Sequence, residues 1–128
     1  MMKKIKVKKF KGCSDQDISD AILNLSNNML TKTNDSKLKE LLISLAIESW
    51  NISLFEAQGN DYKNEIKKRI PSSFSEEYKK VLTSFMLDFI KVKQETYKDI
   101  MKGIVSHTIS YKDKKLELYL KTLPVKPI

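Results

Sequence analysis

Cysteine, glycine and proline are scarce in this sequence, and each shortage excludes a class of protein. The single cysteine, Cys13, cannot form an intramolecular disulfide, which argues against a disulfide-stapled secreted domain. Three glycines and three prolines leave long stretches without a breaker, which favours helices over a many-stranded barrel or sandwich. Because there is also no basic and then apolar leader with a small-residue cleavage site, we expect a reducing, cytoplasmic location.

Histidine and long apolar runs are also scarce. His107 is the only histidine, so any triad-like arrangement would have to include it, and one histidine with one cysteine cannot supply the usual zinc ligands. No glycine-rich phosphate loop is present. The sequence therefore predicts no catalytic residue, no metal site and no cofactor, and we expect that the protein is not an enzyme. The most apolar stretch, residues 41–54, is shorter than the roughly 18 to 20 residues that a membrane span needs, so we expect no transmembrane segment.

Acidic residues are absent from the N-terminal end, and the charge is therefore uneven. The formal charge of +8 divides into +6 for residues 1–11, +3 for residues 112–128 and −1 for the body between them. All basic residues except Arg69 are lysine, and lysine lacks the planar fork that suits bidentate phosphate and base contacts. The candidate polyanion contacts are nine lysines at the two ends: Lys3, Lys4, Lys6, Lys8, Lys9, Lys11, Lys112, Lys114 and Lys115.

What is present fits one helical domain. The length of 128 residues suits a single core, and 41% hydrophobic with 31% charged residues is ordinary for a globular protein. Helical periodicity and capping residues predict three longer helices, starting near Asp15, at Asp35 or Ser36, and at Ser73, and a short one before Pro71. We expect a helical body over residues 14–102, with the second helix, which carries Trp50, at its centre.

Residues beyond Gly103 change period from helix to strand. Apolar and polar residues alternate over residues 104–122, which predicts a β-hairpin that turns at Lys112–Lys115. The alternation places His107 with Val105 and Ile109 on the face expected to be buried. Residues 1–12 fit either a third strand or a basic tail, and residues 123–128 a tail. The predicted fold class is mainly α, a four-helix core with a C-terminal hairpin.

Two acidic residues interrupt apolar helix stripes and are candidates for an acid–base pair. Glu48 lies in the second helix and Asp88 in the fourth. Inward carboxylates on facing helices could do acid–base work. The favoured alternative is that both lie at the stripe edges and pair with lysines such as Lys91 or Lys93, so we expect no convergence with His107.

Two segments carry a resemblance to a known family. Residues 48–54 contain Trp50-Asn51, and residues 90–97 contain spaced lysines and Tyr97 ahead of the hairpin. This arrangement, over residues 46–122, resembles a family of small uncharacterised bacterial helical proteins with a Trp-Asn helix motif and a C-terminal β-pair. The resemblance implies the fold and brings no activity with it. It agrees with our expectation that Trp50 is buried and Asn51 bonds a neighbouring element.

Two functions follow from these patterns. The first is a non-enzymatic protein that binds a protein partner or forms a homodimer, for which Tyr62, Phe74, Tyr97 and Tyr119 would supply an exposed apolar patch. The alternative is an accessory binder of nucleic acid or another anionic surface, weak and without sequence preference, that uses the lysine-rich termini.

Overall fold

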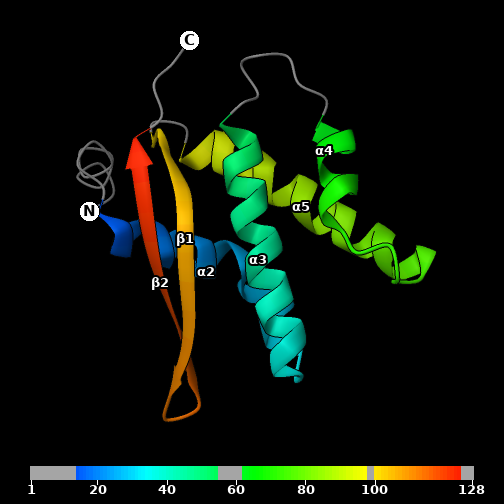
Figure 1. The fold of residues 1–128 in the computed structure, drawn as a ribbon, viewed down its shortest axis with the longest axis horizontal. Coiled ribbons are helices and arrows are strands. Elements are labelled where there is room, and N and C mark those ends of the chain that lie inside the picture. Colours follow the sequence, from blue (N-terminus) through cyan, green and yellow to red (C-terminus); the bar gives the residue numbers. More distant parts are fainter. Residues whose placement is uncertain (1–13, 55–61, 98–99, 125–128) are drawn as a thin grey trace.

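The structure is a computed structural model that describes residues 14–54, 62–97 and 100–124 (Figure 1). Its elements are α2 (Asp15–Thr31), α3 (Ser36–Ser53), α4 (Tyr62–Arg69), α5 (Glu76–Thr96), β1 (Lys102–Lys112) and β2 (Lys115–Pro124). The prediction of a mainly α fold with one short helix and a C-terminal β-hairpin is confirmed. The predicted third strand or tail at residues 1–12 lies outside the described residues.

The starts of α2 and α3 follow from local capping chemistry. The Ser14 hydroxyl accepts from the Asp17 N–H at 3.1 Å, and the Asp17 carboxylate accepts from the Ser14 N–H at 3.2 Å, which makes a reciprocal capping box. Asp35 caps α3 by accepting from the Lys37 N–H at 2.9 Å. Both starts agree with the prediction because these contacts span three residues or fewer.

The two ends of α5 differ from the prediction. The N-cap is Ser75 rather than Ser73, and Phe74 packs edge-on against Tyr78 with ring centroids 5.0 Å apart. The Ser75 hydroxyl accepts from the Tyr78 N–H at 3.1 Å, which caps the helix at this position. The helix ends at Thr96 instead of continuing to about residue 102, because Lys102 and the residue after it pair with the end of β2.

Helix α3 is the centre of the core, as predicted. It contacts α2, α4, α5 and β1, and in Figure 1 it stands between the hairpin on one side and α4 on the other. Trp50 is fully buried in it. The other fully buried large side chains come from all four helices and from the segment before β1: Ile18, Ile22, Leu42, Ile43, Ile66, Leu82, Met86, Ile90 and Ile100.

The hairpin is a long two-stranded antiparallel ribbon. Lys112 pairs with Lys115 across a two-residue turn in which Asp113 and Lys114 have φ values of 52° and 67°. Such left-handed pairs are typical of tight hairpin turns whose twist matches that of the strands. The predicted turn position is confirmed, and the strands extend slightly beyond the predicted residues 104–122.

A β-bulge overturns part of the predicted alternation in β1. The register shifts between Ile104 and Ser106, so Val105 is an extra residue. Ile104 is buried and Val105 is 55% exposed, the reverse of the predicted pattern. His107 is also exposed, although we expected it on a buried face. The reason is that α3 holds β1 only at its start and diverges from it toward the hairpin tip (Figure 1).

Candidate functional site

The hairpin is held to the helices by Trp50 and Asn51 of α3. The Trp50 indole Nε1 donates to the Lys102 carbonyl at 2.8 Å. The Asn51 Nδ2 donates to the Ile104 carbonyl at 3.0 Å, while its Oδ1 accepts from the Ile104 N–H at 2.9 Å. One side-chain amide therefore bonds both backbone groups of one residue, as a neighbouring strand would. The predictions of a buried Trp50 and a bonded Asn51 are confirmed.

Lys93 of α5 strengthens the same region and was missed at the sequence level. It is only 2% exposed, its Nζ lies 4.8 Å from the centroid of the Trp50 ring, and it donates to the Ile100 carbonyl at 3.0 Å. The Tyr97 ring is tilted against that of Trp50, with the two centroids 6.2 Å apart. The helical spacing of buried residues could have predicted the burial of Lys93, because Lys93 lies on the same face of α5 as the buried Met86 and Ile90.

The outer edge of β2 is covered by α2. The Ser19 hydroxyl donates to the Leu118 carbonyl, and the Thr122 hydroxyl donates to the Asp15 carboxylate. The Ser19 bond also shows that the Leu118 carbonyl points away from β1. In an antiparallel pair, alternate residues turn their N–H and C=O groups toward the partner strand and away from it. Leu118 is one of the residues whose groups point away.

The outer edge of β1 past the bulge is open. Ile109 pairs with Leu118, so its N–H and C=O also point outward, and the same holds for His107 and Tyr111 two residues to either side. We call the outward backbone groups of these three residues the open edge. Among the described residues the sheet contains only β1 and β2. His107 and Tyr111 are exposed and Ile109 is half-buried, so the edge is accessible at both of its ends.

The open edge lacks the protection usual for edge strands. Natural proteins deter unwanted strand pairing with charged side chains, prolines or a covering element. Residues 103–111 contain no Lys, Arg, Asp, Glu or Pro, although 31% of the whole chain is charged. Val105 supplies a bulge, but it precedes the open edge. The edge therefore presents three N–H and three C=O groups with no charge beside them.

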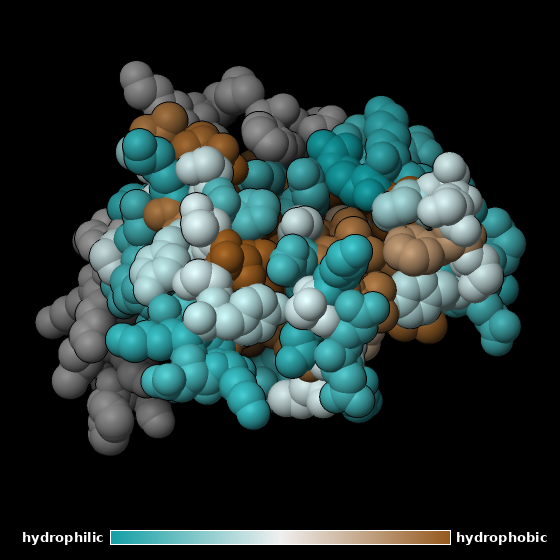
Figure 2. Space-filling model, turned by 60° about the horizontal axis from the view of Figure 1, so that its bottom comes forward, coloured by the Kyte–Doolittle hydropathy of each residue, from teal (hydrophilic) through white to brown (hydrophobic). Residues whose placement is uncertain are grey.

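The exposed apolar side chains also gather on the hairpin. Among the described residues, six large apolar side chains are exposed, and four of them belong to β1 or β2: Val105, Tyr111, Tyr119 and Leu123. Tyr119 donates a hydrogen bond to Glu117 at 2.8 Å, which raises the pKa of its hydroxyl. On the face shown in Figure 2, apolar residues appear as separate areas among hydrophilic ones.

The predicted patch of four aromatic residues does not form. Phe74 precedes α5, on the far side of the molecule from the hairpin that carries Tyr119 (Figure 1). Phe74 and Tyr97 are half-buried against other rings, and only Tyr119 is exposed. The side chain of Tyr62 lies outside the described part. The patch prediction was wrong because ring packing within the helical body used two of its members.

The structure separates the residues weighed as an acid–base site. The Arg69 Nε lies 3.1 Å from the Glu48 Oε1, and its Nη1 lies 2.7 Å from the Glu65 Oε1, so Glu48 is paired by α4 and not by Lys91 or Lys93. Hydrogen bonds from Arg69, and then from Lys68, hold the pKa of Glu65 below its usual value. Asp88 is exposed on α5.

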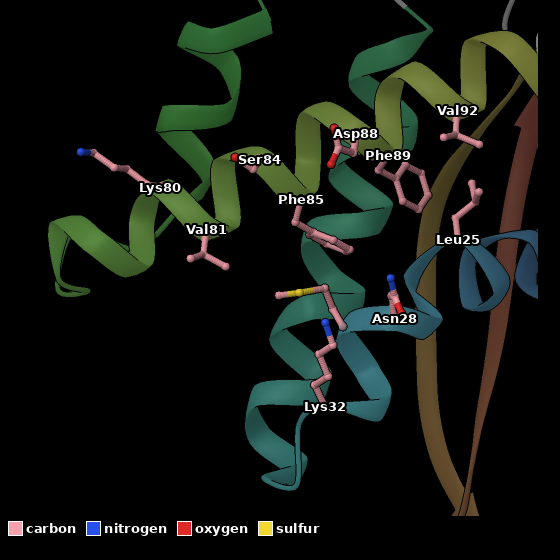
Figure 3. Close-up of a pocket in the computed structure, with 11 residues that line it drawn as sticks. Leu25, Asn28, Lys32, Lys80, Val81, Ser84, Phe85, Asp88, Phe89 and Val92 are labelled. Carbon is pink, nitrogen blue, oxygen red and sulfur yellow. The ribbon is translucent and has the colours of Figure 1, made fainter.

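Asp88 lines a groove between α2 and α5 of about 510 Å³ (Figure 3). Leu25, Phe85 and Phe89 form its apolar part, while Lys80 stands at one end and points away from it. His107 does not line this groove. Within residues 14–54, 62–97 and 100–124, no group of three or more His, Cys, Asp or Glu side chains is arranged to hold a metal ion.

The candidate polyanion contacts divide between described and undescribed residues. Lys112, Lys114 and Lys115 are exposed together at the hairpin tip, with Asp113 between them. The other six, Lys3, Lys4, Lys6, Lys8, Lys9 and Lys11, lie outside the described residues. Polyanion binding by the lysine-rich ends therefore stays a prediction.

Comparisons with protein-family models, with curated proteins and with solved structures found no match to this chain. Among the helices described, none is both long and apolar enough to span a membrane.

Proposed function

We propose that the protein is a non-enzymatic interaction module that binds an extended protein segment along the open edge of β1. Three outward N–H groups and three outward C=O groups, which no strand in the described part of the chain pairs with, carry this proposal. An added strand would bond all six, as in other complexes formed by strand addition. The reducing, cytoplasmic compartment expected from the single cysteine belongs to the same proposal.

The way the hairpin is mounted supports this function. Strand addition needs a preformed edge, because ordering a free hairpin on binding would cost conformational entropy. Asn51 and Trp50 fasten the start of β1, and α2 fastens β2 through Ser19. The open edge is thus held in a strand conformation before any partner arrives.

A paired experiment at His107 tests the proposal. His107→Pro and His107→Ala both remove the imidazole, but only proline removes the outward N–H and places a ring in the path of an added strand. The His107 N–H makes no hydrogen bond to β2, so the hairpin should stay folded in the proline variant. Unchanged Trp50 fluorescence would verify that it does. A partner purified with the wild-type chain is then titrated against both variants.

We expect the alanine variant to bind the partner like the wild type and the proline variant to lose binding. Amide hydrogen exchange at Ile109 and Tyr111 should slow in the complex, because their N–H groups become bonded. Equal binding by both variants, with no change in exchange at these amides, would refute strand addition.

The lysines at the hairpin tip support a second candidate, a weak polyanion binder. Three exposed lysines within four residues form a small basic site on a protruding turn. If these lysines act with the N-terminal ones, binding to DNA, RNA or anionic vesicles should fall by orders of magnitude between about 50 and 200 mM salt. Replacing Lys112, Lys114 and Lys115 by glutamine, or removing residues 1–11, should each weaken that binding. No binding at low salt would exclude this candidate.

A further inference from the structure

We infer that the segment bound by the open edge is β1 of a second copy of this chain, paired antiparallel about Ile109. The inference rests on the proposed strand addition and names its partner. The result would be a closed dimer with a continuous sheet in the order β2, β1, β1 of the second copy and β2 of the second copy. Such a two-fold interface requires a self-complementary surface. The open edge has this property.

The register follows from which backbone groups are free. His107, Ile109 and Tyr111 are spaced two apart, so a two-fold axis at Ile109 sets Ile109 against its own copy and His107 against Tyr111 of the second copy. This pairing joins all six outward groups of each chain. If the two-fold axis lay nearer Ile104, the added strand would reach backbone groups that Asn51 already bonds. If the axis lay nearer the turn, some of the outward groups would have no partner.

The charge distribution favours a second copy. A chain with a net charge of +8 repels itself, so a self-association surface should be the part without lysines. Residues 103–111 are that part of the hairpin. In the proposed register Lys112 lies opposite Ser106 of the second copy, and the two lysine-bearing tips lie at opposite ends of the interface. No like charges face each other along the paired strands.

The bulge at Val105 marks the end of the edge nearest the helices. Residues 105–108 are exposed, whereas Ile104 is buried and its backbone groups are bonded by Asn51. The tip of the second copy would reach the level of Val105 and stop there, below the Ile104 groups that Asn51 bonds. The bulge at Val105 thus coincides with the end of the proposed interface.

The chain's own residues 1–13 are the competing occupant, and they lie outside the described residues. Residues 1–11 carry six lysines and no acid, whereas residues 103–111 of a second copy carry no Lys, Arg, Asp or Glu and match the uncharged edge. We therefore commit to the second copy, and removal of residues 1–11 distinguishes the two occupants.

Two cysteine variants test the register directly, in a Cys13→Ser background. In the proposed pairing, Thr108 lies opposite Ser110 of the second copy as a non-hydrogen-bonded pair, with Cα atoms about 4.5 Å apart. That distance is within the range of a disulfide. Under mild oxidation, an equal mixture of Thr108→Cys and Ser110→Cys chains should form several times more disulfide dimer than either variant alone. Dimer yield that is no higher in the mixture would overturn the register.

Mass measurements on the full chain test self-pairing itself. The wild type and His107→Ala should show a concentration-dependent species of twice the chain mass, and His107→Pro should lose it. A wild type that stays monomeric at all concentrations would overturn the second copy as the partner. So would a dimer that appears only after residues 1–11 are removed, because that result would place the N-terminal segment on the edge.

The outcomes separate this inference from the proposed function. If the wild type is monomeric but another protein binds it and is lost in His107→Pro, self-pairing is wrong and strand addition stands. If a dimer forms equally well in His107→Pro and His107→Ala, self-pairing and strand addition are both wrong, because the dimer contact then does not use the open edge.

Discussion

Asn51 is the residue whose replacement best tests how the hairpin is attached. Asn51→Ala removes two hydrogen bonds at once and leaves the N–H and C=O of Ile104 without their partner. A typical hydrogen bond contributes about 1 kcal/mol net, and a buried group left unpaired costs about 1 to 3 kcal/mol. Because these bonds are only partly buried, water replaces some of the loss, and we expect a decrease of about 2 to 3 kcal/mol in the free energy of unfolding.

The assay is urea denaturation followed by fluorescence. Trp50 is the only tryptophan, and it is fully buried between the helices and the start of β1, so its emission reports detachment of the hairpin as well as global unfolding. The matched control is Glu40→Ala on the same helix, because Glu40 is exposed. Surface replacements of this kind usually stay within about 0.5 kcal/mol.

Hydrogen exchange adds a site-specific result. The Ile104 amide should be protected in the wild type and exchange rapidly in Asn51→Ala, because Asn51 is the acceptor for that amide. A loss of stability no larger than that of Glu40→Ala, together with an Ile104 amide that stays protected, would refute the role given to Asn51.

Three further predictions concern the same core and its neighbours. Trp50→Ala should cost about 3 to 5 kcal/mol in urea denaturation followed by circular dichroism, because it empties a fully buried site, and a loss below about 1 kcal/mol would contradict the packing. Lys93→Met should lower the free energy of unfolding by about 2 kcal/mol, because methionine keeps the buried stem but leaves the Ile100 carbonyl without the charge-assisted hydrogen bond that Lys93 donates. No loss of stability would contradict the role given to this bond. Glu65 has a lowered pKa in the folded state, so its ionised form contributes stability above its unfolded pKa and loses it as the pH falls through the folded pKa. Glu65→Gln should therefore destabilise the protein near neutral pH and be without effect in acid; an effect that grows toward low pH would reverse the sign expected from Arg69.

The proposed interaction surface has a direct link to Trp50 and Asn51. The contact of Asn51 with Ile104 both attaches β1 and ends its open edge, because it bonds the backbone groups that a longer added strand would need. The bulge at Val105 changes which residues of β1 face outward, from Ile104 before it to His107 after it. One side chain and one extra residue therefore set where the proposed strand pairing would begin.

The chain's local sequence determined most of its secondary structure. The capping residues Ser14 and Asp35 act within three residues, so the starts of α2 and α3 could be predicted without knowing the fold. The burial of Trp50 followed from an apolar helix with two apolar sides, and the hairpin turn followed from the period of the flanking residues. These features depend on short-range geometry and on periodicity, both of which can be read along one segment.

Tertiary contacts decided the rest. Pairing with β2 ended α5 at Thr96 although the apolar pattern continued, and packing against the Trp50 ring buried Lys93, a residue type that is normally exposed. The bulge at Val105 and the exposure of His107 depend on how far α3 follows β1. Which edge of the hairpin is covered depends on where α2 docks, and α2 contacts β2 about a hundred residues away in sequence. No periodicity within one segment encodes a contact of that separation, so the open edge appears only once the elements are assembled.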